Sequence, residues 1–143
     1  KVSKKIGSIV RSSGRLLKSN EGGKIRAHGM LPKVQGMGVT LEEMGISQVS
    51  MNLLDASLCP LHLAYKTCES LAADHDVELC GSEIVGLVPL SAMVEAGRYF
   101  SPNTEDERAL VKVAVESLGL NAYHDFDPER HIIEWALRSE VNA

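Results

Sequence analysis

KVQGMGVTLEEMGISQVSMNLL, residues 33–54, is the stretch that decides the fold. Residues 33–40 and 46–54 alternate between apolar side chains and small or polar ones, which is the period of a strand with two unlike faces. Between them, residues 42–45 (Glu-Glu-Met-Gly) form a short turn. Because so short a connection usually joins neighbouring antiparallel strands, the sequence predicts a β-hairpin here.

Alternation gives the hairpin one face that is more polar than the other. Three amides, one hydroxyl and one lysine share this face with Met37: Gln35, Gln48, Asn52, Ser50 and Lys33. Compact neutral donors and acceptors suit a semi-enclosed binding site, whereas the alternative is a face that simply meets solvent. On the other face, Gly36 and Gly38 either let another group approach the backbone closely or mark a bulge.

On either side of the hairpin, helical spacing predicts three helices and a helical tail. They are an amphipathic helix of residues 2–13 ending near Gly14, a helix from Pro60 to about Asp74, a short helix from Pro89 to Gly97, and a helical tail from 104 onward. In the tail, Thr104-x-x-Glu107 resembles a capping box and Gly119 a stop, while Asp127-Pro128 has the character of a second helix start.

The remaining segments complete the expected order. Residues 77–82 alternate like a third strand, and residues 15–30 form a long, flexible loop rich in glycine and basic residues. Helix, strand, strand, helix, strand and helices make up most of a split βαβ arrangement. We therefore expect one α+β, ferredoxin-like domain over residues 1–143, with a mixed or antiparallel sheet, helices on one face and a helical C-terminal tail.

Charge is distributed unevenly along the chain, although the net charge is only −4. Residues 1–33 hold nine Lys and Arg against one acid, which gives +8, and the rest holds six against eighteen, which gives −12. Such asymmetry indicates an anionic partner or a solvated basic helix face. Nucleic acid is a poor candidate because the basic stretch has no Phe, Tyr or Trp to stack on bases.

The cysteines and the apolar runs indicate a cytoplasmic protein. Cys59, Cys68 and Cys80 are odd in number and lack the CxxC spacing, so we expect reduced thiols. No apolar run reaches the ~18 residues of a membrane span, and the start has no signal-peptide pattern. Since Lys1 opens within a helical pattern, we expect a piece cut from something longer.

No arrangement of residues indicates catalysis or metal binding in this chain. His62, His75 and His131 occupy helix positions that are more often structural, and no Ser-His-Asp or Cys-His grouping is supported. His124-Asp125-x-Asp127 looks like a metal cluster, but Asp127 is better explained as a helix cap. We expect neither a catalytic residue nor a metal.

Four separate motifs carry a resemblance that extends over nearly the whole chain. They are KVQG (33–36), QVSMNLLD (48–55), PLH (60–62) and GSEIVGLVP (81–89), followed by ERHIIE at 129–134. In order and spacing they resemble the C-terminal subdomain of glutamate formiminotransferase, in the formiminotransferase-cyclodeaminase family. Any one motif alone would be weak.

The resemblance implies a catalytic domain of two ferredoxin-like subdomains with the folate in a tunnel between their sheets. The reaction passes a formimino group from N-formimino-L-glutamate to tetrahydrofolate, including polyglutamylated forms, in histidine degradation. The general acid/base histidine would belong to an N-terminal subdomain. This chain alone would then be an inactive half of a transferase, partnered by that subdomain and forming a homodimer, without nucleic acid or membrane.

The expected folate- and substrate-binding residues lie on the three predicted strands, or in the case of Glu83 directly after the third: Lys33, Gln35, Gln48, Ser50, Asn52, Ser82 and Glu83. Lys33 would hold a carboxylate and Glu83 an ammonium or amine; the alternatives are a surface lysine and a turn carboxylate. Residues 15–30 look longer than the family's loop, so their basic residues receive no role. A rival hypothesis is a non-catalytic ferredoxin-like module that binds a small ligand or dimerises.

Overall fold

The computed structural model describes residues 8–9, 11–12, 15–27 and 29–141. The chain divides into two units, Lys1–Cys59 and Pro60–Ala143, and each is described by itself. Among the described residues, the first unit contains strands and one short 3-10 turn, and the second contains helices and an isolated β-bridge. The single domain expected over residues 1–143 stays a prediction.

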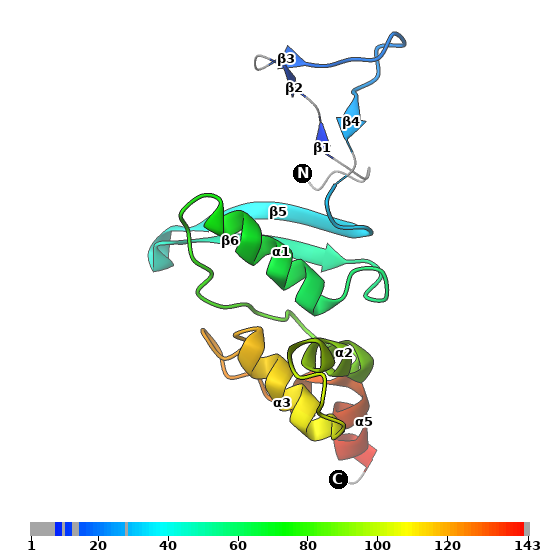
Figure 1. Cartoon of the computed structure of the whole chain (residues 1–143), viewed down its shortest axis with the longest axis vertical. Helices are drawn as coiled ribbons and strands as arrows, with labels where there is room; N and C mark the ends of the chain where they lie inside the picture. The colour runs from blue at the N-terminus through cyan, green and yellow to red at the C-terminus, as the bar shows by residue number, and fades with distance from the viewer. Residues whose placement is uncertain (1–7, 10, 13–14, 28, 142–143) are drawn as a thin grey trace. The chain divides into compact units, whose positions relative to one another are not determined.

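The predicted hairpin is confirmed in the first unit. Strand β5 (Val34–Leu41) pairs antiparallel with β6 (Ile46–Leu53) over eight residues each, with the register Val34↔Leu53 to Leu41↔Ile46 (Figure 1). A 3-10 turn, η1 (Glu42–Met44), joins them, and Gly45 follows with φ of 64°. That left-handed conformation is comfortable for glycine, which explains why the turn closes there.

The helix expected over residues 2–13 is wrong where the chain is described. Four short strands stand in the N-terminal stretch: β1 (Ser8–Ile9), β2 (Arg11–Ser12), β3 (Arg15–Leu16) and β4 (Arg26–Ala27). β1 pairs with β4 and β2 with β3. Residues 1–7, 10 and 13–14, on which part of that helix was predicted, lie outside the described residues.

The segment 15–30 has more regular backbone than the expected loop. Lys18 and Lys24 form an antiparallel bridge, and Ser19 N–H donates to Gly23 O at 2.7 Å around a tight turn. Gly22 in this turn has a positive φ of 79°, which glycine adopts easily because it has no side chain. The glycines therefore close a turn rather than keep the segment irregular.

Helix α1 (Leu61–Ala73) opens the second unit and confirms the helix expected from Pro60, which is its N-cap. The third strand expected over residues 77–82 is wrong: this stretch has no strand partner among the described residues. Instead, Ser82 N–H donates to Gly119 O at 3.2 Å, so the segment is bound to the end of a helix. Alternation alone cannot distinguish a strand from an extended linker.

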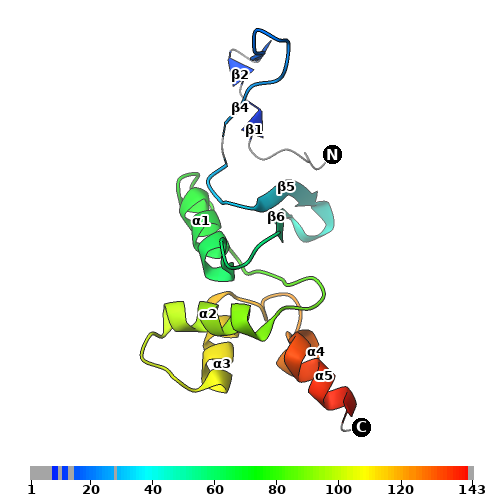
Figure 2. The ribbon, with the colours of Figure 1, turned by 90° about the vertical axis from the view of Figure 1, so that its right-hand side faces the viewer.

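The pair α2 (Leu90–Phe100) and α3 (Glu107–Ser117) forms the centre of the helical unit (Figure 2). Gly97, expected to stop α2, lies inside it and packs against α3: a Cβ placed there would come within 2.6 Å of the Leu110 carbonyl carbon. The glycine is thus a close-packing point between helices, and the true stop is three residues later. Met93 and Leu110, both 0% exposed, are central to this core.

The ends of the tail helices differ from the expected caps in two places. Asp106, not Thr104, caps α3, because its carboxylate accepts from Ala109 N–H at 2.8 Å. Asp127 caps as expected, but the last helix is broken into α4 (Pro128–His131) and α5 (Ile133–Val141). The break lies at Ile132, which forms a parallel bridge with Val88.

These observations confirm the α+β class and leave the ferredoxin-like topology unconfirmed. The described strands form three separate two-stranded pairs rather than one sheet. The core of the helical unit is closed by α2, α3 and α5, with Ile132 at 0% and Trp135 at 4% exposed.

Candidate functional site

The register of the hairpin brings four of the seven predicted site residues onto one face. Directly opposed residues in an antiparallel pair share a face, and here Gln35 opposes Asn52, Met37 opposes Ser50 and Val39 opposes Gln48. We call Gln35, Gln48, Ser50 and Asn52 the amide face. None of the four makes a side-chain hydrogen bond to any residue that the structure describes, so their donors and acceptors are available to a ligand.

The polarity of this side of the hairpin decreases from one end to the other. At the end away from η1, Gln35 and Asn52 pair two amides, while at the η1 end the same face carries the apolar pair Leu41 and Ile46. Asn52 and Ser50 are exposed, and Gln35 and Gln48 are half-buried. A ligand with a polar and an apolar part matches this gradient better than a purely charged one.

The opposite face of the hairpin is mostly apolar and contains the two glycines. Gly36 opposes Met51 and Gly38 opposes Val49, so both glycines lie away from the amide face. A Cβ at Gly36 would touch the Met51 side chain at 3.5 Å, whereas one at Gly38 would meet nothing within 4 Å. Val49 remains 60% exposed, so another group has access to this face at Gly38.

Lys33 stands at the amide-paired end with a left-handed backbone, φ 53°. Its carbonyl accepts from Leu54 N–H at 2.9 Å, which extends the ladder by one bond. Because a non-glycine residue is uncommon in this region, the conformation is held by its surroundings. The Lys33 side chain is exposed, as a carboxylate-binding role requires.

Asp55 carries a negative charge near Lys33, and it was not among the residues expected at the site. Its Oδ1 accepts from the Ser57 hydroxyl at 2.6 Å and from Ser57 N–H at 3.0 Å. Those bonds hold the pKa of Asp55 below its ordinary value, the hydroxyl first and the N–H next, with smaller contributions from Leu58 N–H and the positive charge of Lys33. The D-x-S spacing is the sequence signal for such a turn.

Ser82 and Glu83 are not part of the hairpin. The Ser82 hydroxyl donates to Leu118 O at 2.5 Å, which satisfies a free carbonyl at the end of α3. Glu83 is exposed and has no hydrogen-bond or ion-pair partner in the part of the chain that is described. Ser82 was expected on the polar face of a third strand, and that strand does not form among the described residues.

The histidines do not build a catalytic group among the described residues. His62 stacks on Tyr99 with ring centroids 4.3 Å apart, and burial lowers its pKa below the ordinary value while Glu95 partly opposes the shift. Its Nδ1 is buried without a hydrogen bond. His131 stacks on Phe126 at 5.1 Å. Three or more His, Cys, Asp or Glu side chains nowhere gather around a possible metal position in the described ranges.

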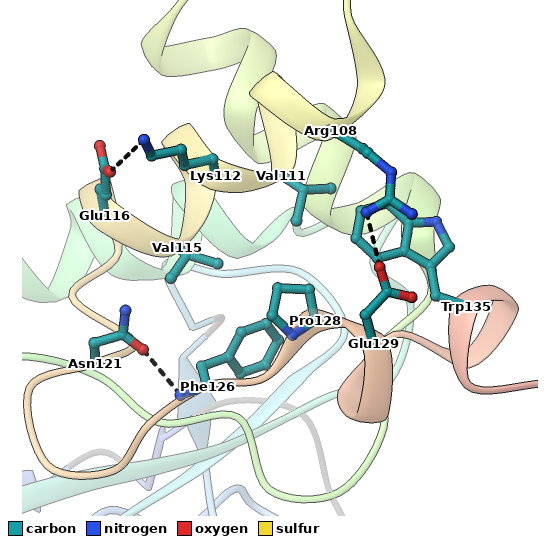
Figure 3. A pocket seen from close by; sticks show the side chains of 10 residues that line it. All are labelled: Arg108, Val111, Lys112, Val115, Glu116, Asn121, Phe126, Pro128, Glu129 and Trp135. Atoms are coloured by element: carbon teal, nitrogen blue, oxygen red, sulfur yellow. Dashed lines mark hydrogen bonds and ion pairs between the residues drawn. The ribbon is translucent and has the colours of Figure 1, made fainter. Parts of the chain in front are cut away.

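A pocket of about 400 Å³ lies in the helical unit, between α3 and residues 121–129. Figure 3 shows Val115 on α3 directed toward Phe126, with the paired Lys112 and Glu116 side chains directed away from it. Its walls combine apolar and charged side chains: Arg108, Val111, Lys112, Val115, Glu116, Asn121, Phe126, Pro128, Glu129 and Trp135. No residue expected from the sequence to bind folate lines it.

Comparison with known families decides the class of the chain. The family described as "Formiminotransferase domain" matches residues 1–138. The chain belongs to the formiminotransferase family. That membership makes it part of a family of one-carbon transferases and confirms the resemblance carried by the four motifs.

Relatives in the formiminotransferase family are much longer than this chain. Formimidoyltransferase-cyclodeaminase of Rattus norvegicus is 38% identical over 111 residues, 75% of this chain and 20% of the relative. The Dictyostelium discoideum protein of the same name is 33% identical over 143 residues, 97% of this chain and 25% of the relative. Glutamate formimidoyltransferase of Streptococcus pyogenes serotype M1 is 30% identical over 99 residues, 69% and 28% respectively. The chain thus spans about a quarter of their length.

No helix among the described residues is both long and apolar enough to pass through a bilayer.

Proposed function

We propose that this chain forms the folate- and substrate-binding half of a glutamate formiminotransferase. The whole enzyme would transfer a formimino group from N-formimino-L-glutamate to tetrahydrofolate in histidine degradation. The observation that carries the proposal is the amide face, where four side chains with unused hydrogen-bonding capacity share one side of a single hairpin. Membership of the formiminotransferase family supports the reaction class.

The chemistry divides naturally between binding and proton transfer. Formimino transfer needs an amine nucleophile, a group that accepts its proton, and stabilisation of a tetrahedral adduct. The amide face carries neutral amides and a hydroxyl, which orient a substrate but do not take a proton at neutral pH. We therefore propose that an N-terminal formiminotransferase subdomain supplies the acid/base histidine, that this chain alone is inactive, and that the assembled enzyme is a homodimer.

Each hairpin residue has a distinct role in this proposal. The amides of Gln35 and Asn52, paired across the strands, hydrogen-bond the pterin or amide edges of the folate. Ser50 and Gln48 continue that row, and Lys33 binds a carboxylate at the same end. Asp55 is bonded to Ser57 and close enough to Lys33 for the lysine to influence its pKa.

On the helical unit, the proposal keeps Glu83 as the group that holds a substrate ammonium. The Ser82 hydroxyl already donates to Leu118 O, so its contribution is to hold the neighbouring backbone rather than to bind ligand directly.

The test combines the full chain with an N-terminal subdomain from a relative such as the Streptococcus pyogenes enzyme. Formimino transfer is expected from the mixture and from neither component. Folate affinity of the mixture, measured by isothermal titration calorimetry, is expected to fall by about tenfold or more in the Gln35→Ala/Asn52→Ala variant. Two hydrogen bonds made only in the complex account for a loss of that order.

A matched control is available on the other face of the same hairpin. Thr40 and Ser47 are also a directly opposed, exposed polar pair. The Thr40→Ala/Ser47→Ala variant removes as many polar side chains and should leave folate affinity unchanged. Equal losses in both variants would contradict the assignment of the amide face, and a mixture without activity would contradict the half-enzyme.

A further inference from the structure

The register of the hairpin determines which backbone groups point away from it. Leu54 N–H donates to Lys33 O at 2.9 Å, so these two residues form a hydrogen-bonded pair, and such pairs recur at every second position of an antiparallel ladder. The backbone N–H and C=O groups of the residues in between point outward, away from the partner strand. On β5 the outward residues are Val34, Gly36, Gly38 and Thr40, and on β6 they are Ser47, Val49, Met51 and Leu53.

Both outer edges of the hairpin are unprotected. None of these outward backbone groups is hydrogen-bonded to a residue that the structure describes. Native proteins commonly cover a strand edge or blunt it with a charged residue, a proline or a bulge. Neither β5 nor β6 contains Lys, Arg, Asp, Glu or Pro, and their register has no bulge over eight pairs. Since a two-stranded hairpin is only marginally stable alone, an added strand would stabilise it.

The two glycines make the β5 edge the more accessible one. Gly36 and Gly38 are both exposed, and neither carries a side chain that would crowd an approaching backbone. The unbroken register excludes the alternative that they mark a bulge. Glycine disfavours a strand, so close approach of another backbone gives a physical reason for two glycines in β5.

We propose that the β5 edge pairs antiparallel with the β5 edge of a second copy of this chain, about a two-fold axis at Met37. Gly36 of one copy then lies opposite Gly38 of the other. Val34 lies opposite Thr40 in the same way, so outward groups meet outward groups and each pair exchanges two hydrogen bonds. The two hairpins become one four-stranded sheet, and because both copies use the same surface, the assembly closes as a dimer.

The charges that flank β5 favour this antiparallel arrangement. Lys33 precedes the strand and Glu42 follows it, and both are exposed. Antiparallel pairing brings Lys33 of each copy near Glu42 of the other, whereas parallel pairing brings like charges together. The β6 edge has no such match, because acids flank it on both sides, Glu43 before it and Asp55 after it.

The β5 edge is thus the interface of the homodimer proposed above, and in that respect the inference rests on the proposed function. It does not rest on folate binding, since backbone groups form this interface and amide side chains form the folate site. The test uses neither folate nor an N-terminal subdomain, so either proposal can fail without the other. Because small interfaces are usually weak, we expect a dissociation constant of about 10–100 µM.

Sedimentation velocity of the full chain between roughly 5 and 500 µM tests the dimer. A reductant is present, because Cys80 is exposed and its thiol would otherwise be able to cross-link two copies. A reversible equilibrium between monomer and dimer is expected. A chain that stays monomeric up to roughly 500 µM, or that forms open-ended assemblies, would overturn the proposal.

Amide hydrogen exchange locates the contact in the unaltered chain. Raising the protein concentration through the dissociation constant should slow exchange at Gly36 and Gly38 by about tenfold, because their N–H groups become hydrogen-bonded. Exchange at Val49 and Met51, on the β6 edge, should not change. A dimer that protects the β6 amides instead, or the amides of neither edge, would overturn the assignment.

Two proline variants form a matched pair, because Gly38 and Val49 oppose each other in the register and both N–H groups point outward. Neither proline removes a hydrogen bond of the β5–β6 ladder, since an edge position does not use the lost N–H. Gly38→Pro should weaken dimerisation by about tenfold or more, and Val49→Pro by less than about twofold. Equal weakening by the two variants would contradict the choice of the β5 edge.

Discussion

The β5–β6 hairpin and the α2–α3 pair use their side chains in opposite ways. Every described residue of the hairpin strands is at least partly exposed, and its polar side chains have no partner among the described residues. In α2 and α3, by contrast, a row of small and branched residues is buried, including Ala96, Leu110 and Ala114 at 0% exposed. The helical pair therefore accounts for stability, and the hairpin retains the groups that are free to bind.

Truncation of a buried side chain should show the largest difference between the regions. Ile132→Ala should lower the free energy of unfolding by about 4 kcal/mol, because Ile132 is 0% exposed and its loss leaves a cavity. Urea denaturation followed by fluorescence of Trp135, the single tryptophan of the chain, measures it. Val49→Ala in the hairpin, at 60% exposed, should cost less than about 0.5 kcal/mol. Similar losses of unfolding free energy in the two variants would contradict the view that the helical unit, and not the hairpin, accounts for stability.

Glycine substitution should give the next largest contrast. Gly97→Ala forces a Cβ against the Leu110 backbone and should cost about 2–3 kcal/mol, despite the better helix propensity of alanine. Gly38→Ala meets nothing within 4 Å and should change stability by less than about 0.5 kcal/mol. The same denaturation experiment compares the two. If Gly97→Ala were neutral, the close contact between α2 and α3 would be refuted.

Acid should affect the helical unit at a higher pH than the hairpin. The pKa of His62 is lowered on folding, so its contribution is fully present above the ordinary value of 6.5 and is lost as the pH falls below it. The pKa of Asp55 is lowered from 3.8, so its contribution persists to more acidic solution and is lost as the pH falls through the folded value.

Denaturation of the wild type and His62→Gln between pH 7 and 5 tests this order. Because His62 is only partly buried, we expect the wild type to lose less than about 1 kcal/mol over this range. The glutamine variant should lose less than the wild type, since it cannot titrate. An equal slope in both proteins would show that another group governs the acid response.

The smallest effect should come from the amide face itself. Gln35→Ala/Asn52→Ala removes exposed or half-buried side chains without partners, so stability should change by less than about 0.5 kcal/mol. Thermal unfolding monitored by circular dichroism measures the change. Combined with the expected loss of folate affinity, that result would separate binding from stability in the hairpin. A loss above 1 kcal/mol would indicate a structural role.

Some of the fold could be predicted because its signals are local. Two alternating segments joined by four residues leave few options other than a hairpin, and Gly45 supplied the left-handed residue of the turn. Pro60 and Asp127 marked helix starts correctly for the same reason. Periodicity was less reliable at the N-terminus, where four described residues predicted as helix are in short strands.

The residues of the candidate site were also predictable only where the sequence signal was local. Gln35, Gln48, Ser50 and Asn52 were correctly predicted to share a face, since the side-chain period of a strand is 2 and the short turn determined the register. Ser82 was placed on a third strand that does not form, because its alternation could not reveal that Leu118 O would take its hydroxyl. The pocket beside α3 had no local signal, as its walls come from segments that meet only on folding.

By itself, the sequence determined the hairpin and its polar side, the helix starts at proline and aspartate, and the family. Tertiary structure alone decided that Gly97 is a packing point, that the tail helix breaks at Ile132 and that α3 and residues 121–129 line one pocket. The physical reason is range: turns, caps and strand faces depend on residues a few positions apart. Close packing depends on atoms brought together from distant positions, and no periodicity in the chain encodes which atoms those are.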